Sequence, residues 1–173
     1  MTAAEPADGI ADGTERTLAR IVSGLDYPMM VVTAHSQEGP AGCLVGFTTQ
    51  CSIHPPRFLV CLSDKNRTEH VASHADVLAV HFLAEDALGL ARAFGEQTTD
   101  DTDTFSRWRW HEGPRGAPIL DACGQWFVGE ILERRPLGDH MAYVLRPIAA
   151  SDSGPGPGLT FQQVKDLDPG HRP

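Results

Sequence analysis

The sequence predicts an α+β protein built on an antiparallel β-barrel with flanking helices. About six or seven segments have the apolar patterning of strands, and about three have the periodicity of helices. The strands do not alternate regularly with the helices, which favours an antiparallel barrel over a parallel doubly wound sheet. The chain of 173 residues is long enough for one well-filled core and too short for two full domains.

The strands are marked by apolar runs between turn residues. Pro55 and Pro56 precede the nearly continuous apolar run at 57–63, which predicts a strand buried on both faces. The same patterning predicts turns at 37–40 and 136–139. It predicts the other strands at 27–34, 42–52, 77–83, 123–133 and 140–148, with a short edge strand at 159–164.

A first helix is predicted to begin at Thr14, whose hydroxyl is a good N-cap. Its apolar positions form one stripe that we expect to face a core: Leu18, Ile21, Val22 and Leu25.

Two further helices are predicted in the middle of the chain. Asn66 followed by Glu69 has the spacing of a capping box and predicts a short helix through Ala75. The amphipathic pattern at 84–94 predicts a helix that ends at Gly95, a residue favoured just past a helix.

The ends of the chain differ in composition from its middle. Residues 1–13 are rich in Ala, Asp, Glu, Gly and Pro, which predicts a disordered tail. We therefore expect one domain at 14–150, containing a polar surface loop at 97–103. Residues 151–173 are expected to form a flexible linker, rich in Gly and Pro, and a C-terminal segment.

The bulk properties exclude several classes of protein. A net charge of −9 argues against a nucleic-acid partner, because such proteins need a basic surface. No apolar run approaches the roughly 20 residues that cross a bilayer, so no membrane association is expected. The acidic N-terminus lacks the basic start and apolar stretch of a secretory signal, which predicts a cytoplasmic protein with reduced cysteines.

Several common motifs are missing from the sequence. It has no G-x-G-x-x-G, no phosphate-binding loop ending in Lys-Ser/Thr, and no G-x-S-x-G. His70 and His74 have the i, i+4 spacing of two metal ligands on a helix, the basis for a metal-dependent hydrolase as one hypothesis. No third ligand is evident, so a solvated helix face is favoured and no metal is predicted.

The strongest pattern begins at Gly42 and ends near Thr68. A strand opened by Gly42 leads to Ser52 and the Pro-Pro pair, then to the apolar strand at 57–63 and to Asn66-Arg67-Thr68. This order resembles the short-chain flavin reductases, which are FMN-binding split barrels. The resemblance continues over most of residues 20–150, through 77–83, Phe105, Trp110, 117–120 and Gly138-Asp139-His140.

The resemblance implies a Greek-key-like split barrel and an NAD(P)H-dependent flavin reductase. It implies FMN or FAD as cofactor, NADH or NADPH as co-substrate, a homodimer, and a monooxygenase that receives the reduced flavin. His140 is implied as the catalytic residue beside flavin and nicotinamide; without the resemblance, it reads as a turn residue. The cofactor-binding residues implied are Gly46, Phe47, Thr48, Thr49, Gln50, Ser52, Ser63, Asn66, Arg67 and Thr68.

The residues themselves leave alternatives open at this site. Asn66, Arg67 and Thr68 at a helix start offer a phosphate cradle, or a plain helix cap with a surface arginine. Gly46 allows close approach of a ligand, or marks a strand bulge. Thr48, Thr49 and Gln50 either line the flavin or pair across strands.

The chain departs from the family pattern at 44–47. Reductases of this family carry a polar run after the opening glycine, whereas this sequence has Leu-Val-Gly-Phe. The flavin ring environment is therefore expected to be more apolar. With His54 and His81 at strand positions, this departure motivates an alternative function, a non-catalytic flavin- or haem-binding barrel.

Overall fold

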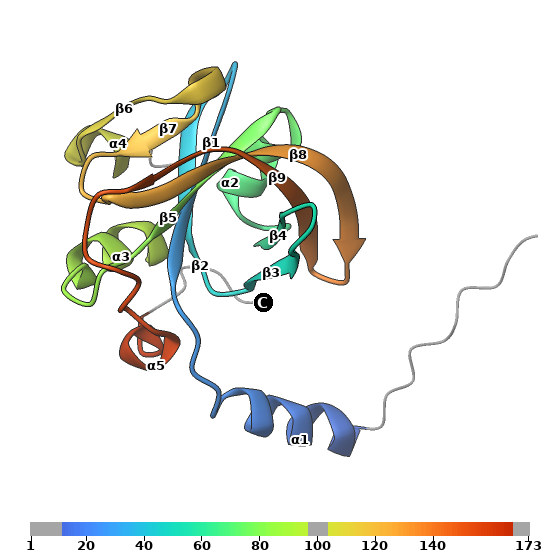
Figure 1. The fold of residues 1–173 in the computed structure, drawn as a ribbon. Coiled ribbons are helices and arrows are strands. Elements are labelled where there is room, and N and C mark those ends of the chain that lie inside the picture. Colours follow the sequence, from blue (N-terminus) through green and yellow to red (C-terminus); the bar gives the residue numbers. More distant parts are fainter. Residues whose placement is uncertain (1–11, 97–103, 168–173) are drawn as a thin grey trace, which may run out of the picture.

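The computed structural model describes residues 12–96 and 104–167 (Figure 1). The tail predicted at 1–13 lies outside the described residues, except for Asp12 and Gly13, which begin a helix. The loop predicted at 97–103 lies outside them entirely. No helix in the described ranges is both long and apolar enough to cross a membrane.

Seven strands form one sheet in which all neighbours are antiparallel. Their order across the sheet is β2-β1-β5-β8-β9-β4-β3, and a small second sheet pairs β6 with β7. The predicted α+β antiparallel barrel with flanking helices is thus confirmed. The strands are β1 (Met30–Ser36), β2 (Gly39–Val45), β3 (Thr48–Ser52), β4 (Arg57–Ser63), β5 (Val77–Phe82), β6 (Trp110–Glu112), β7 (Pro118–Leu120), β8 (Gln125–Leu137) and β9 (His140–Asp152).

The barrel is closed by two strands that follow one another in the chain but lie at opposite edges of the sheet. These are β2 and β3, which only Gly46 and Phe47 connect. A connection this short keeps Val45 and Thr48 within about 11 Å of each other. The sheet must therefore curl until its two edges meet, although β2 and β3 do not pair with each other.

The single strand predicted at 42–52 is therefore wrong. The chain stops pairing with β1 at Val45, opposite Met30, and begins pairing with β4 at Thr48, opposite Val60. Both halves carry residues that favour strands, so composition does not reveal the break. The turn predicted at 37–40 is also shorter than expected, because β2 already begins at Gly39 with φ +91°.

Five α-helices and one 3-10 helix are found in the described ranges. The helix α2 begins where its Asn66 N-cap predicted, with Asn66 Oδ1 accepting from the Thr68 amide at 2.9 Å. The helix predicted at 84–94 begins only at Leu88 and includes Gly95. The elements are α1 (Asp12–Val22), α2 (Arg67–Ser73), α3 (Leu88–Gly95), α4 (Thr104–Arg107), η1 (Pro114–Gly116) and α5 (Phe161–Val164).

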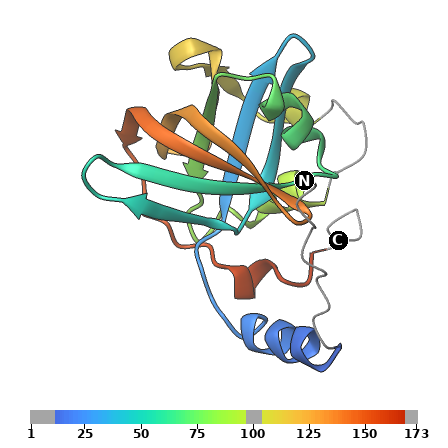
Figure 2. The ribbon, with the colours of Figure 1, turned by 90° about the vertical axis from the view of Figure 1, so that its right-hand side faces the viewer.

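The apolar stripe of α1 does not face a core within the chain, contrary to expectation. The helix lies apart from the barrel, joined to it by the segment that leads to β1 (Figures 1 and 2). Its apolar side chains are 43–59% exposed: Leu18, Ile21, Val22 and Leu25. The helical period is present as predicted, but nothing in the described chain covers the stripe.

The edge strand predicted at 159–164 is wrong, because this segment forms α5. Thr160 caps the helix in a capping box with Gln163, a pattern visible in the sequence as T-x-x-Q. Only an isolated bridge between Pro28 and Thr160 has strand geometry. Leu159 is 1% exposed, so the segment packs against the barrel.

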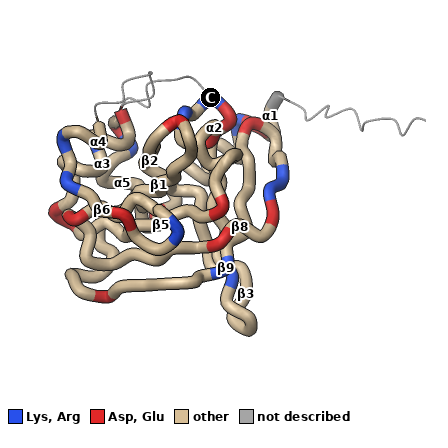
Figure 3. Tube along the Cα trace, turned by 90° about the horizontal axis from the view of Figure 1, so that it is seen from above, with Lys and Arg blue, Asp and Glu red and all other residues tan. Residues whose placement is uncertain are grey.

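The β8–β9 hairpin is longer than predicted at both ends. Each strand has 13 residues, and the turn is confined to Gly138 and Asp139, with Gly138 at φ +66°. Because β9 continues to Asp152, the first two residues of the segment expected to be a linker belong to a strand. Charges of both signs lie along the outside of the barrel (Figure 3), where Glu130 bonds Arg115 at 2.8 Å and also Arg146.

His81 is a buried polar group of the barrel with both ring nitrogens satisfied. The Leu120 amide donates to its Nε2 at 3.1 Å, so the proton is on Nδ1, which donates to the Val31 carbonyl at 3.0 Å. Burial lowers the pKa of His81 from 6.5 to about 4, although the bond to Val31 opposes the shift. His81 therefore joins β5, β1 and β7 as a neutral imidazole.

This neutral histidine predicts a loss of stability in weak acid. Between pH 6.5 and about 4 the unfolded chain binds a proton on His81 that the folded chain excludes. The free energy of unfolding should therefore fall by up to about 3 kcal/mol as the pH drops through this window. Urea unfolding at pH 7, 5.5 and 4.5 measures the fall. It should persist in His35→Gln, which removes an exposed histidine, and equal stability at all three values would contradict the prediction.

Candidate functional site

A cavity of about 310 Å³ opens where the chain crosses from β2 to β3. Its wall comes from the ends of β2 and β4, from α3 and α5, and from the segment before β1. Most of the wall is apolar: Tyr27, Met29, Cys43, Leu44, Val45, Phe47, Cys61, Leu62, Phe94 and Phe161. The volume lies within the range of about 300–1,000 Å³ of small-molecule sites, which are mostly apolar with a few polar groups.

Gly46 lies at the crossing, where the backbone approaches the wall closely. A Cβ on this residue would lie 2.4 Å from Cε2 of Tyr27 and 3.1 Å from Sδ of Met29. The ring of Tyr27 is itself stacked on Phe161, with centroids 4.9 Å apart and planes at 14°. A side chain at position 46 would therefore push this aromatic stack, and glycine is required here for packing.

The polar groups of the cavity gather where β4 ends and α2 begins. Ser63 is the last residue of β4, and Asn66 is the N-cap of α2. Ser63 pairs with His140, the first residue of β9, which also lines the cavity. Hydrogen-bonding side chains thus converge at one end of an otherwise apolar hollow.

His140 is held in place by its neighbour in the chain and by Phe47. Its Nδ1 lies 2.7 Å from Oδ1 of Asp139, and its ring centroid lies 5.2 Å from that of Phe47. The hydrogen bond from His140 lowers the pKa of Asp139, which keeps this carboxyl ionised at neutral pH. A carboxylate only accepts hydrogen bonds, so the proton is on Nδ1 and Nε2 keeps its lone pair.

The two cysteines of the wall act as apolar groups. Burial raises the pKa of Cys43 to about 12, although a hydrogen bond with Thr68 opposes the shift. Burial also raises the pKa of the Cys61 thiol. Both are therefore protonated at neutral pH and are poor nucleophiles.

Only part of the predicted set of site residues lines this cavity. The residues brought together there are Gly46, Phe47, Ser63, Asn66 and His140. The apolar run at 44–47, where the chain departs from the family pattern, forms the wall at the crossing.

The polar residues of β3 lie elsewhere, on the hairpin that β3 forms with β4 (Figure 2). Thr48 Oγ1 lies 3.4 Å from Sδ of Met30, and Thr49 donates to the Gln50 carbonyl at 3.3 Å. Gln50 in turn donates to the Ser52 carbonyl at 3.2 Å. These residues thus bond within the hairpin or to the barrel and do not line the cavity.

Arg67 and Thr68 also lie outside the cavity wall. The guanidinium of Arg67 donates to the carbonyls of Pro40 and Glu38, at 3.2 and 3.3 Å. Thr68 is buried behind the wall, beside Cys43. In this structure Arg67 therefore holds the β1–β2 turn against α2.

Sequence reasoning missed the wall that the two ends of the domain supply. Tyr27 and Met29 precede β1, and Phe161 comes from α5. The amide of Phe161 donates to the Tyr27 carbonyl at 2.9 Å, which joins the two segments. The capping box around Thr160 was the available signal for α5, but nothing in the sequence places Phe161 beside Tyr27.

The histidines behind the alternative and the metal hypotheses are also placed. His81 has both nitrogens bonded and His54 is exposed on the β3–β4 hairpin, so neither faces the cavity. His70 and His74 lie on the surface at α2, and the fold brings Glu38 beside them as the third ligand that the sequence did not reveal.

Comparison with known proteins gives a family and several relatives. The family described as "Flavin reductase like domain" matches residues 22–166. An FMN reductase (NADH) of Cronobacter sakazakii is 30% identical over 144 residues, which are 81% of this chain and 84% of the relative. The reductase component of 4-hydroxyphenylacetate 3-monooxygenase of Escherichia coli is 29% identical over 72% of this chain and 75% of the relative.

A probable flavin reductase of Rhizobium meliloti is 29% identical over 71% of this chain, and the match spans only 40% of that longer relative. Among solved structures, an NADH:FAD oxidoreductase of Streptomyces globisporus superposes with a TM-score of 0.77 at 24% identity. That match covers 91% of this chain and 92% of the other and shows a shared fold. The family match, the crossing of β2 to β3 and the cavity there agree, and the chain belongs to the flavin reductase-like domain family.

Proposed function

We propose that this protein is an NAD(P)H-dependent flavin reductase that transfers hydride from NADH or NADPH to FMN or FAD. The observation that carries the proposal is the apolar cavity at the β2–β3 crossing, in a chain of the flavin reductase-like family. Related enzymes are named for FMN with NADH in one case and for FAD with NADH in another. Both flavins are therefore included.

The cavity has the chemistry that a flavin needs. The wall around Phe47 and Leu44 offers an apolar surface to a flat ring system, and Gly46 leaves room that a side chain would take. Ser63 and Asn66 supply polar groups for the hydrophilic part of the cofactor. When bound, the flavin supplies the hydride acceptor, and the protein supplies binding, orientation and exclusion of water.

His140 is proposed as the residue that orients the nicotinamide. Its Nδ1 proton is directed to Asp139, so the lone pair of Nε2 is left to accept a hydrogen bond from a ligand in the cavity. Phe47 limits the tilt of the imidazole from the other side. The pair Asp139–His140 thus fixes a single hydrogen-bond acceptor at the polar end of the site.

The remaining predicted residues are proposed for contacts beyond the cavity. Thr48, Thr49, Gln50 and Ser52 lie on the β3–β4 hairpin, where a second subunit is able to bring them next to a flavin. Arg67 and Thr68 stay candidates for the phosphate end, because Asn66 beside them lines the cavity. No metal takes part in this reaction scheme.

The partners are proposed from the relatives and from the exposed surface. One relative is the reductase component of a monooxygenase, which supports transfer of reduced flavin to a separate monooxygenase. A homodimer is proposed because the apolar stripe of α1 is exposed in the single chain. We also propose a cytoplasmic location, since all four cysteines are free thiols.

Purified protein should accelerate anaerobic oxidation of NADH or NADPH when FMN or FAD is added. The decrease in nicotinamide absorbance, measured for each of the four pairs, reports the rate. Loss of the His140 hydrogen bond, worth about 1.5 kcal/mol, should lower kcat/KM for the nicotinamide by about tenfold in His140→Ala. No acceleration by the wild-type protein with any pair would refute the proposed function, and an unchanged rate in His140→Ala would refute the role of this residue.

Gly46→Ala should weaken flavin binding. The added Cβ displaces the Tyr27 ring, and overpacking of about 1–3 kcal/mol corresponds to at least about a fivefold rise in Kd. Flavin fluorescence quenching measures the affinity. Gly89→Ala is the matched control, because nothing lies within 4 Å of its Cβ. Equal affinities in the two variants would show that the flavin does not occupy this cavity.

The dimer should depend on the apolar stripe of α1. Light scattering after gel filtration should give twice the chain mass of 18.7 kDa for the wild type. Leu18→Glu with Ile21→Glu should give monomers, since charges on the buried stripe prevent association. Arg16→Glu with Arg20→Glu changes the opposite face of the helix and should leave the dimer intact. A monomeric wild type would contradict the assignment.

A further inference from the structure

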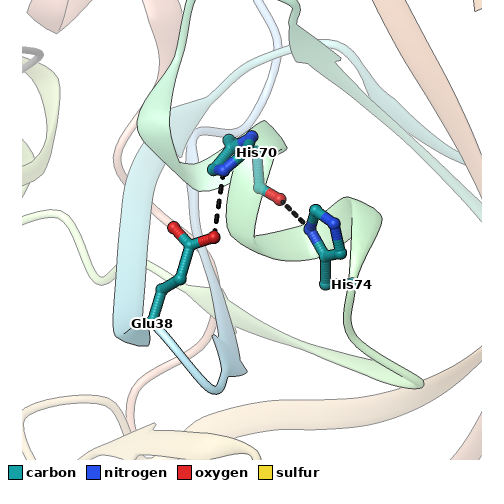
Figure 4. Close-up of side chains that lie close together, drawn as sticks. All are labelled: Glu38, His70 and His74. Atoms are coloured by element: carbon teal, nitrogen blue, oxygen red, sulfur yellow. Dashed lines mark hydrogen bonds and ion pairs between the residues drawn. The ribbon is translucent and has the colours of Figure 1, made fainter.

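Three metal-ligating side chains meet on the surface where the β1–β2 turn lies against α2 (Figure 4). Glu38 comes from the turn, His70 from the last turn of α2, and His74 from its C-cap. One ligand atom from each residue lies within 4.8 Å of the other two. All three residues are exposed, so an ion in solution reaches them directly.

The pair of Glu38 and His70 already has nearly the spacing of two ligands on one ion. Oε1 of Glu38 lies 3.1 Å from Nε2 of His70. Zinc binds imidazole nitrogen and carboxylate oxygen at about 2.0–2.2 Å, which in a tetrahedron separates the two ligand atoms by about 3.4 Å. An ion that replaces the proton between the two groups therefore needs little movement of either side chain.

The tautomer of His74 suits a ligand. Its Nδ1 lies 3.1 Å from the carbonyl oxygen of His70 and 3.0 Å from Oγ of Ser73. The hydroxyl of Ser73 donates its own proton to the same carbonyl, at 2.7 Å, so both neighbours of Nδ1 are acceptors. The proton is therefore on Nδ1 and the lone pair is on Nε2. Histidine ligands of metals are commonly held by this kind of bond to a carbonyl.

The backbone that carries these side chains is fixed on both sides. Arg67 donates to the carbonyls of Glu38 and Pro40, which holds the turn to α2. The Glu38 amide is also bonded, at 3.2 Å, to Oγ of Ser36. The hydroxyl of Tyr143 donates to Glu69 at 3.0 Å, which holds α2 to the barrel. The three ligands therefore lie on elements whose relative position does not depend on a metal.

We propose that Glu38, His70 and His74 form a binding site for a divalent transition-metal ion, and that Zn²⁺ is its ligand. Two imidazoles and one carboxylate are a donor set typical of zinc, with water completing the tetrahedron. The site lies at the end of α2 opposite Asn66, outside the flavin cavity, and it is independent of the proposed reductase activity. Bound zinc would join the β1–β2 turn to α2 and stabilise the folded chain.

Zinc binding is measured on the full chain without an added histidine tag, by competition with a chromophoric chelator. We expect one Zn²⁺ per chain in the wild type. Glu38→Gln, His70→Ala and His74→Ala should each lower the affinity by at least about tenfold, a loss seen even for partners outside the ligand set. Saturating Zn²⁺ should raise the Tm of the wild type, because the ion binds only the folded chain, and should not raise that of the variants.

His54→Ala is the matched control, since it removes an exposed histidine outside the cluster. It should retain both the affinity and the rise in Tm. The proposal is overturned if the wild type does not bind zinc stoichiometrically, or if the three cluster variants bind zinc as tightly as His54→Ala does. Because the readouts are zinc affinity and Tm, they are independent of whether the chain reduces flavin.

Discussion

The two-residue connection between β2 and β3 is the constraint on which the rest of the structure depends. These strands are the two edges of a seven-stranded sheet, and Gly46 and Phe47 alone join them. A connection of about 11 Å at most forces the sheet to close. Because the edges converge without pairing, side chains fill the space between them, and the cavity lies there. The barrel and the site are thus consequences of one short crossing.

The crossing also explains why so apolar a run occupies it. Val45 and Cys43 point into packed surroundings at the end of β2, and Gly46 must be small because Tyr27 lies against it. Phe47 alone is largely exposed, with its ring near His140. Hydroxyls resume at Thr48, where pairing with β4 has already begun. The wall at this position therefore offers shape and apolar contact, and the hydrogen-bonding groups come from the ends of β4, α2 and β9.

The fold class was predictable because strands such as 57–63 have strong local patterns, and Asn66 is a helix cap that its own side chain satisfies. The break at Gly46 was not, since Leu-Val-Gly-Phe reads as continuous strand and only pairing with different partners divides it. The site was predicted where its residues follow each other in sequence, as at Ser63 and Asn66. Phe161 and Glu38 reach their neighbours through tertiary contacts, which periodicity does not encode.

Arg67 connects the two sites on α2 and sets a limit on how mutations there are interpreted. It follows Asn66, which lines the cavity, yet its guanidinium bonds the carbonyls of Glu38 and Pro40. Removing this side chain takes a positive charge from the vicinity of a flavin phosphate and releases the turn that carries Glu38. A loss of flavin affinity in such a variant therefore has two physical causes. Glu38→Gln separates them, because it leaves both carbonyls, and so the hold of Arg67 on the turn, in place.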